Sequence, residues 1–471
     1  MSHTVTDAQR KWLPLLAAVG FFMQALDGTI LNTALPSMAE TLGESPLQMQ
    51  SVIIAYMLTV ALLIPASGWL ADRFGTRRIY LAAISLFTLG SLACAASNSL
   101  SMLVAARVLQ GIGGALLMPV GRLAVLRVYD KHELLRVMSF VTIPGLLGPL
   151  MGPALGGWLV EVASWHWVFL INLPVGLLGF IASWHFMPEL RQQTARFDWQ
   201  GFVMFSVGMV LVSVGLQGLG EHSISTGWAL FALIFGLAAM ASYWLYAANA
   251  QQPLFSLNLF KTATFAIGIW GNLFARLGSG AMPFLTPLFL QLGLGFSPSK
   301  AGMTMIPTVI GAMLTKTLVN KLIPKVGYRR ILIGNTLLLG AMIASFYFID
   351  NQLPYVVLLG WLAIFGAINS LQFSAMNTLT LQDLSPTLAS SGNGLLSVVM
   401  QLSMSLGVAI AASLLGLFSA GTSAGTLAAE GQWLAGFHLT YLCVGLLSML
   451  AALIFAQLAR DGATPSGRAD S

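Results

Sequence analysis

Long runs of apolar residues recur along the whole chain, separated by short polar connections. A transmembrane helix needs about 20 predominantly apolar residues, and the runs reach that length. The connections are too short to hold a soluble domain. The pattern predicts an all-α integral membrane protein with about 14 transmembrane helices, near residues 12–34, 48–70, 78–97, 101–124, 137–160, 166–187, 199–217, 227–248, 264–292, 301–322, 329–349, 354–377, 392–416 and 435–459.

The composition agrees with a membrane location. The chain is 57% apolar and 8% charged, whereas soluble domains carry about 25% charged residues. Its 48 glycines suit membrane helices, which pack closely through small residues. Cys94 and Cys443 both lie in apolar runs, so we expect neither a disulfide framework nor a metal site. No cofactor is expected.

The charged residues predict the orientation in the membrane. If the N-terminus is cytoplasmic, the connections alternate between the two sides, and Lys300 alone of the basic loop residues falls outside. This bias matches the positive-inside rule and predicts both termini in the cytoplasm; it also explains the net charge of +6 without nucleic-acid binding. The first run lacks a cleavage site and is expected to be its own insertion signal. The cytoplasmic basic residues are Arg10, Lys11, Arg73, Arg77, Arg78, Arg127, Lys131, Arg136, Arg191, Arg196, Lys261, Lys321, Lys325, Arg329, Arg330, Arg460 and Arg468.

An internal repeat divides the chain. Residues 70–79 align with residues 322–331, and Arg73 pairs with Lys325 in this alignment. The two copies are eight predicted helices apart, which suggests two six-helix bundles with two further helices inserted between them. The predicted units are an N-terminal bundle at 1–190, an inserted helix pair and linker at 191–262, and a C-terminal bundle with a short cytoplasmic tail at 263–471. Transporters built from such halves bind substrate between them.

One carboxylate, Asp27, lies well inside the first apolar run. A charged group at that depth costs at least about 2.5–3.5 kcal/mol unless it is neutralised, paired or hydrated. The functional interpretation is a group that takes up and releases a proton. The structural alternative is an aspartate satisfied by neighbouring helices.

Four stretches in order carry a resemblance to a known family. They are Leu26–Pro36 (LDGTILNTALP), Gly68–Arg78 (GWLADRFGTRR), Arg107–Gly114 (RVLQGIGG) and the proline–glycine run between Pro144 and Gly157. Together they resemble the major facilitator superfamily, and more narrowly its 14-helix drug/proton antiporter branch. The runs FFMQALD and IPASGWLAD point within that branch to multidrug transporters of Gram-negative bacteria.

The resemblance places the 101–124 span beside the first span. Asp27 and Arg107 then both lie roughly 10 Å below the outer boundary, at 1.5 Å per residue. Arginine favours the ionised carboxylate and burial favours the neutral form, so Asp27 is interpreted as the group that couples proton and substrate, tuned by Arg107, with Gln110 in the same network. The alternative is a static ion pair. No second acid is evident in the C-terminal bundle, which makes competition between proton and substrate at Asp27 the coupling mechanism to test.

Two motifs are expected to act between the bundles. By resemblance, the loop with Gly68, Asp72, Arg73, Gly75, Arg77 and Arg78 is a cytoplasmic latch in which Asp72 contacts the opposite half; alternatively its arginines only mark topology. In the 137–160 span, Gly148, Gly152 and Gly156 share one helix face. We expect either a bent contact with the opposite half or plain tight packing. The motif residues of this antiporter helix are Pro144, Gly145, Gly148, Pro149, Gly152, Pro153, Gly156 and Gly157.

The favoured function is proton-coupled efflux of small molecules across the bacterial inner membrane by a monomer, of the multidrug type. Candidate cavity residues are Arg276, Asn272, Asn377 and Gln401. Arg107 and Arg276 put two positive charges in the membrane, against one clear carboxylate, Asp27. The alternative is therefore an exporter of an anionic metabolite or a citrate-like metal chelate. A membrane sensor without transport would not need the motif residues. No nucleophile–base or metal-ligand cluster suggests an enzyme, and no phosphate-binding loop suggests ATP use.

Overall fold

The computed structural model describes residues 5–192, 196–221, 225–419 and 427–458, and within these ranges every regular element is a helix. The first half contains α1 (Asp7–Ile30), η1 (Leu31–Thr33), α2 (Leu35–Leu42), α3 (Gln50–Phe74), α4 (Thr76–Ala95), α5 (Leu100–Val128), α6 (Lys131–Val162), α7 (His166–Leu170) and α8 (Asn172–Phe186). In the middle of the chain are α9 (Trp199–Glu221) and α10 (Thr226–Asn249). The second half contains η2 (Leu257–Lys261), α11 (Ala263–Leu288), the π-helical turn η3 (Phe289–Gly293), α12 (Pro298–Thr304), α13 (Ile306–Val326), α14 (Tyr328–Ala344), η4 (Ser345–Phe348), α15 (Tyr355–Gln382), α16 (Pro386–Phe418), α17 (Leu427–Leu450) and α18 (Ala452–Phe455).

The predicted fold class is confirmed. Within the described residues, 12 helical segments are long and apolar enough to cross a membrane. Two more helices, α6 with 32 residues and α13 with 21 residues, occupy the positions of the other two predicted spans. The run predicted as one span at 301–322 is instead divided into the short α12 and the long α13. Pro307 lies in the first turn of α13, where a missing N–H costs nothing, so a helix start is favoured there.

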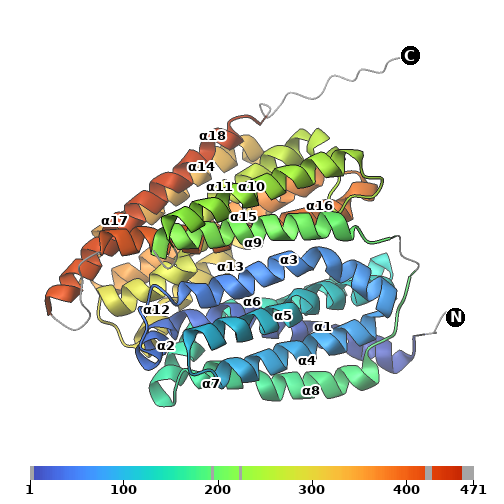
Figure 1. Cartoon of the computed structure of the whole chain (residues 1–471), viewed down its shortest axis with the longest axis horizontal. Helices are drawn as coiled ribbons and strands as arrows, with labels where there is room; N and C mark the ends of the chain where they lie inside the picture. The colour runs from blue at the N-terminus through green and yellow to red at the C-terminus, as the bar shows by residue number, and fades with distance from the viewer. Residues whose placement is uncertain (1–4, 193–195, 222–224, 420–426, 459–471) are drawn as a thin grey trace.

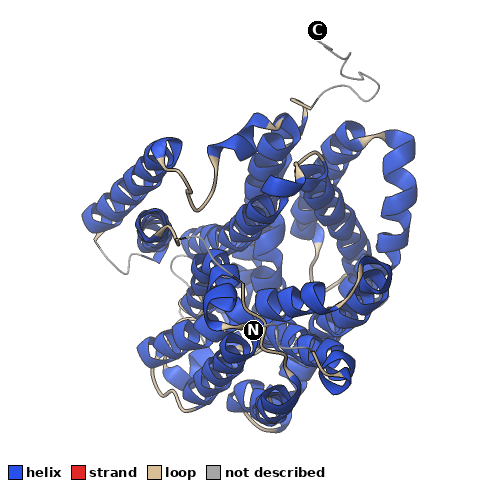
Figure 2. Ribbon diagram, turned by 90° about the vertical axis from the view of Figure 1, so that its right-hand side faces the viewer, coloured by secondary structure: helices blue, strands red, loops and turns tan. Residues whose placement is uncertain are grey.

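Helix contacts group the spans into two bundles. In the first bundle, α1 packs along α6, α5 and α8, and α5 packs on α3 and α4. In the second, α11 packs on α15 and α16, α13 on α15, and α14 on α17. The bundles lie side by side, with α3 against α16 where they meet (Figure 1). Figure 2 gives the view along many of these helices, seen nearly end-on.

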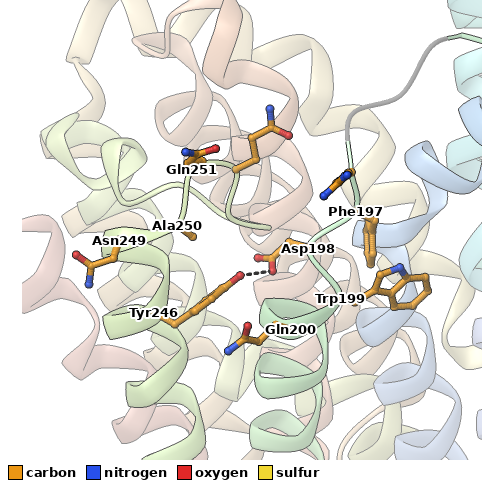
Figure 3. A pocket seen from close by; sticks show the side chains of 10 residues that line it. Phe197, Asp198, Trp199, Gln200, Tyr246, Asn249, Ala250 and Gln251 are labelled. Carbon is orange, nitrogen blue, oxygen red and sulfur yellow. Dashed lines mark hydrogen bonds between the residues drawn. The ribbon is translucent and has the colours of Figure 1, made fainter.

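The inserted helices α9 and α10 form a hairpin that packs on α16. Asp198, just before α9, anchors this hairpin. Its carboxylate accepts hydrogen bonds from the backbone N–H groups of Gly201 at 2.8 Å and Leu254 at 2.9 Å, and from the Tyr246 hydroxyl at 2.8 Å. Figure 3 shows the Tyr246 hydroxyl directed at Asp198 beside a cavity of about 1000 Å³. One carboxylate therefore ties the start of α9, the end of α10 and the following linker together.

The two ends of the bundles are distinct, and we name them by their elements. The α2/α12 end lies at the left of Figure 1. The opposite, Gly75/Gly327 end carries the two turns of the internal repeat: Gly75 between α3 and α4 has φ 99°, and Gly327 between α13 and α14 has φ 86°. Glycine adopts such positive values without a steric penalty. The sequence repeat therefore reflects the same backbone turn in both bundles.

Candidate functional site

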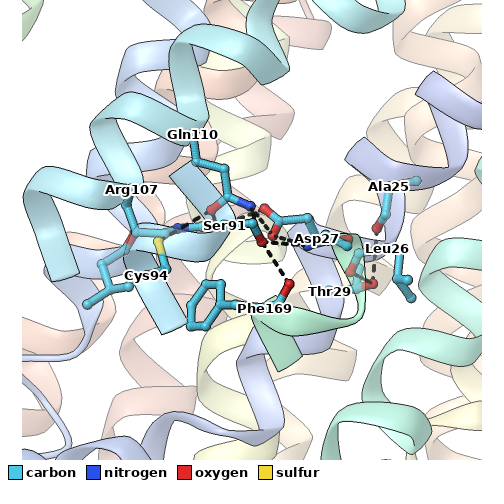
Figure 4. A network of polar contacts seen from close by, with 11 residues as sticks. Ala25, Leu26, Asp27, Thr29, Ser91, Cys94, Arg107, Gln110 and Phe169 are labelled. Carbon is cyan, nitrogen blue, oxygen red and sulfur yellow. Dashed lines mark hydrogen bonds and ion pairs between the residues drawn. The ribbon is translucent and has the colours of Figure 1, made fainter. Parts of the chain in front are cut away.

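Asp27 is the centre of a buried polar network inside the first bundle. Only 1% of Asp27 and 2% of Arg107 are exposed. Arg107 Nη1 donates to Asp27 Oδ2 at 2.7 Å, and Gln110 Nε2 donates to Asp27 Oδ1 at 2.8 Å. Asn172 Nδ2 lies 3.4 Å from the same Oδ1. Figure 4 shows Arg107 and Gln110 converging on Asp27. The sequence-predicted residues Asp27, Arg107 and Gln110 thus come together directly.

Three helices fix this geometry. Asp27 lies in the last turn of α1, Arg107 lies two turns into α5 with Gln110 one turn later, and Asn172 begins α8. The rings of Tyr56 and Phe169 lie 4.2 and 6.0 Å from the guanidinium carbon of Arg107. Aromatic faces attract a cation, and the ion pair neutralises both charges. The buried carboxylate therefore lies directly beside a counter-charge.

Sequence reasoning missed Asn172, Ser91 and Tyr56. Ser91 accepts hydrogen bonds from Asn172 Nδ2 at 3.1 Å and from Gln110 Nε2 at 3.4 Å, and donates to the backbone oxygen of Phe169 at 2.9 Å. The only signal was that Asn172 is a single amide in an apolar run. Such residues also serve plain helix–helix hydrogen bonds, so position in three dimensions was needed to find them.

A cavity of about 310 Å³ lies between the two bundles. Its walls come from α1 and α6 of the first bundle and from α11, α13 and α15 of the second. Most lining groups are apolar, and the polar ones are uncharged: Thr29, Asn32, Ser279, Thr286, Thr308 and Asn369. Asp27 is not among the lining residues, because it faces α5 and α8 within its own bundle. Thr29 and Asn32, on the cavity side of the same helical segment, do line the cavity.

Arg276, Asn272 and Asn377 form a second buried cluster in the other bundle. Arg276 Nε donates to Asn272 Oδ1 at 2.9 Å, and its Nη2 donates to Asn377 Oδ1 at 3.0 Å. The guanidinium carbon lies 3.1 Å from the centre of the Phe373 ring. Within the described part of the chain, Arg276 Nη1 has no hydrogen-bond partner. Three of the predicted cavity candidates therefore contact one another. The fourth, Gln401 on α16, is half-buried. None of the four is among the residues that line the 310 Å³ cavity.

The motif loop at 68–78 is bound to its own bundle. Asp72 forms an ion pair with Arg127 on α5, and the backbone N–H of Gln192 donates to the backbone oxygen of Asp72 at 3.3 Å. Asp72 was expected to contact the opposite half. In this conformation its carboxylate instead pairs with Arg127 of its own bundle. A Cβ on Gly68 would meet nothing within 4 Å, so none of the described helices approaches closely there.

The three arginines of this loop differ from one another. Arg77 donates to the backbone oxygen of Trp184 and lies 5.5 Å from the centre of its ring. Arg78 Nε is 3.8 Å from a Glu189 carboxylate oxygen, and its side chain is 71% exposed. Arg73 is exposed. A Cβ on Gly75 would lie 1.9 Å from the Glu189 side chain, so the turn and the segment after α8 fit tightly together.

The glycine face of α6 packs against α1 of the same bundle. Ideal Cβ atoms on Gly148 and Gly156 would lie 2.6 and 2.2 Å from α1 backbone atoms, and one on Gly152 would lie 2.2 Å from the Thr29 hydroxyl. The predicted small-residue interface is therefore real, but its partner is not the opposite half. A Cβ added to Gly145 would lie 3.5 Å from the ring of Phe21.

Two other residues of α6 do contact the opposite bundle. A Cβ on Gly157 of α6 would lie 2.1 Å from the backbone oxygen of Pro298 in α12. In the reverse direction, a Cβ on Gly302 of α12 would lie 2.1 Å from the backbone oxygen of Pro153 in α6. Pro149 and Pro153 also line the 310 Å³ cavity, whereas Pro144 does not. Both interpretations of the antiporter helix, tight packing and an inter-bundle contact, thus describe different faces of α6.

Comparisons with known proteins agree with the architecture. The family model described as "Major Facilitator Superfamily" matches residues 17–408. The chain is 52% identical over 462 residues to a protein of Pectobacterium carotovorum subsp. carotovorum (strain PC1), with 97% of each covered. It is 50% identical over 471 residues to one of Serratia proteamaculans (strain 568), covering 98% of this chain and 96% of the relative. Both relatives bear the name "Putative multidrug resistance protein MdtD".

Solved structures share the fold at low identity. The nucleoside transporter NupG has a TM-score of 0.68 at 12% identity, covering 94% of this chain and 98% of that one. A D-xylose–proton symporter has a TM-score of 0.65 at 17% identity, covering 95% and 97%. The resemblance drawn from the four sequence motifs is confirmed. With a family model that spans most of its length and relatives at half identity, the chain belongs to the major facilitator superfamily and is a multi-pass membrane transporter of small molecules.

Proposed function

We propose that this transporter exports small molecules in exchange for protons, with Asp27 as the proton-coupling carboxylate. One observation carries the proposal: the end of α1 and the adjoining η1 turn present Asp27 to a buried network on one face and Thr29 and Asn32 to the inter-bundle cavity on the other. A proton taken up by Asp27 removes the charge that holds Arg107 at 2.7 Å. The segment between Asp27 and Asn32 then transmits the change to the cavity wall.

This arrangement favours indirect coupling over competition for one site. Because Asp27 is absent from the cavity lining, substrate and proton occupy different faces of α1. Arg107 and Gln110 both donate to the Asp27 carboxylate, so they are the side chains whose contacts change when Asp27 takes up a proton. The N-terminal bundle at 1–190 and the C-terminal bundle at 263–471 rock against each other, and the 191–262 segment connects them.

The loop charges support an orientation in the bacterial inner membrane. The basic turns at Arg77–Arg78 and Arg329–Arg330 both lie at the Gly75/Gly327 end, which the positive-inside rule assigns to the cytoplasm. The α2/α12 end then faces the periplasm. Each proton entering from that side carries one charge down the membrane potential, worth roughly 2.3 kcal/mol per 100 mV. The working unit is a monomer, because each chain carries both bundles and the cavity between them.

The cavity favours a largely apolar substrate with a hydrogen-bonding group. Its lining is uncharged, and within the described residues Asn369 Oδ1 and Thr308 Oγ1 are buried acceptors without a partner. A donor on the substrate would satisfy them. The names of the relatives, which are multidrug resistance proteins, support a multidrug-type exporter.

An anionic substrate is the second candidate, and Arg276 favours it. Its side chain is fully buried, and none of the ion pairs among the described residues includes it. A buried cation without a counter-ion is costly, so an anion such as a carboxylate metabolite or a metal chelate would be attracted. The candidate requires that the cavity extend to Arg276 in another state of the cycle.

Transport by purified protein in proteoliposomes tests both candidates. A pH gradient should drive uptake of a lipophilic cationic dye in wild-type vesicles, whereas Asp27→Asn should lose gradient-driven accumulation but retain exchange of labelled for unlabelled substrate. Full gradient-driven accumulation by Asp27→Asn contradicts the coupling role. Citrate tested in the same vesicles separates the cargo classes, with Arg276→Gln expected to abolish only citrate transport.

A further inference from the structure

At the α2/α12 end, Glu161 forms a polar contact between the two bundles that no sequence motif marks. Glu161, in the last turn of α6, accepts a hydrogen bond on Oε2 from the backbone N–H of Ser299 at 3.1 Å. Ser299 lies in the first turn of α12, which belongs to the second bundle. This contact joins residues 138 positions apart and crosses between the bundles.

Three further contacts surround this hydrogen bond. The backbones of α6 and α12 approach so closely that only glycine fits at 157 and 302, where an added Cβ would lie 2.1 Å from a backbone oxygen. A little deeper, Gln291 Nε2 in η3 donates to the backbone oxygen of Thr33 in η1 at 3.0 Å. All of these contacts must separate for a passage to open at this end. We name them the α6–α12 closure, comprising Gly157, Glu161, Gln291, Ser299 and Gly302 with their partners.

The charge of Glu161 suits this position. The first turn of a helix leaves backbone N–H groups unpaired, and a carboxylate beside them is electrostatically favoured. Hydrogen bonds from Ser299, with a smaller one from Ser297, hold the pKa of Glu161 below its usual range. The contact therefore persists above the usual glutamate pKa and is lost only as the pH falls through the lowered value. The neighbouring cation, Lys300, lies 3.7 and 5.5 Å from the ring centres of Phe296 and Tyr355.

We propose that Glu161 is a positioning residue of the transport cycle, which holds the α2/α12 end closed by binding the backbone of Ser299. The proposal rests on alternating access between the bundles, but not on which residue takes the proton or which substrate is carried. Glycine packing makes the close approach possible, and the carboxylate adds a directional bond that exists only in the closed arrangement. Loss of this bond shifts the population toward the arrangement open at this end.

Distances between spin labels at the α2/α12 end test the proposal. Asn98→Cys and Asn351→Cys place labels on exposed loops of the two bundles, in full-length protein whose native Cys94 and Cys443 are replaced by alanine. In nanodiscs, Glu161→Gln should raise the ratio of long to short distances by about two- to fivefold, the range expected for a carboxylate at a helix start. Glu40→Gln, at an exposed carboxylate of α2, is the matched control and should change nothing.

Gly302→Ala is the positive control, because its Cβ would collide with the backbone oxygen of Pro153 and force the end apart. If Gly302→Ala lengthens the distances while Glu161→Gln leaves them as in wild type, the closing role of Glu161 is wrong. If both lengthen and thermal unfolding of Glu161→Gln stays unchanged, the role is supported. Gradient-driven transport by Asp27→Asn is a separate measurement, so failure of one proposal is distinguishable from failure of the other.

Discussion

Replacing Asp27 with asparagine should destabilise the protein by leaving Arg107 buried without its counter-ion. The two side chains meet at 2.7 Å and are almost completely buried. Asparagine has nearly the same volume as aspartate and still offers an acceptor oxygen, so the substitution removes charge and little packing. Any large loss of stability therefore reports the electrostatic pairing itself.

The magnitude follows from the remaining partners of Arg107. Removing one member of a buried ion pair costs about 3–5 kcal/mol. Arg107 keeps the Gln110 Oε1 at 2.8 Å, the backbone oxygen of Val52 at 3.3 Å and the Tyr56 ring at 4.2 Å. These contacts still stabilise the guanidinium, so we expect the lower end, about 3 kcal/mol. Arg107→Gln should cost less, because Asp27 can take up a proton whereas a guanidinium does not lose one.

A double-mutant cycle measures the pairing. The Asp27→Asn/Arg107→Gln protein contains neither charge and should be more stable than Asp27→Asn alone, with a coupling energy of up to about 3 kcal/mol. The assay is equilibrium unfolding of each variant in detergent micelles, followed by tryptophan fluorescence. Asp72→Asn serves as the matched control, since the Asp72 and Arg127 side chains are 24% and 15% exposed and a partly solvated pair is expected to contribute about 1 kcal/mol or less.

Two results would refute this reasoning. One is that Asp27→Asn unfolds at the same denaturant concentration as wild type, which would mean that Arg107 needs no counter-ion. Alternatively, the double variant could be destabilised by the sum of the single effects, which would mean that the two charges are not energetically coupled despite their contact.

Three further predictions test other parts of the structure. Gly148→Ala should destabilise the protein by about 1–3 kcal/mol in thermal unfolding, because its Cβ would lie 2.6 Å from the α1 backbone. As the control, Gly28→Ala meets nothing within 4 Å and should be neutral or stabilise by about 0.5–1 kcal/mol. Equal effects of the two substitutions would contradict the packing argument. Gly75→Ala should cost about 1–3 kcal/mol because it forces φ 99° on a residue with a Cβ, and an unchanged unfolding midpoint would show that the turn relaxes. Asn369→Leu should raise the KM for substrate severalfold and leave the dependence on the pH gradient intact; an unaltered KM would remove Asn369 from the binding site.

The order of the spans could be read from the sequence because each run must satisfy its backbone within the bilayer. Apolar length alone forces a helix there, so the runs near 48–70 and 78–97 became α3 and α4 with small shifts of their ends. The run at 301–322 was the exception. Its apolar character continues through Pro307, which favours the start of α13, and the structure shows that the separated α12 packs on α6.

Depth along a helix is also a property of the sequence, but rotation about its axis depends on neighbours. Counting residues placed Asp27 and Arg107 at the same level, and they do meet. Counting could not tell whether Asp27 faces the inter-bundle cavity or the interior of its own bundle, because both neighbours offer polar groups. The structure turns Asp27 inward and leaves Thr29 and Asn32 for the cavity.

The sequence by itself determined an all-helical membrane protein, its internal repeat and the similar depth of Asp27 and Arg107. These follow from local rules: apolar length, a repeated glycine turn, and the number of residues from each helix end. The structure then showed that the two side chains pair directly. Only the tertiary structure decided that Asp72 binds Arg127 in its own bundle and that Glu161 reaches Ser299 in the other. Those partners are distant in sequence, and nothing in an exposed carboxylate's own surroundings along the chain specifies which distant backbone it will meet.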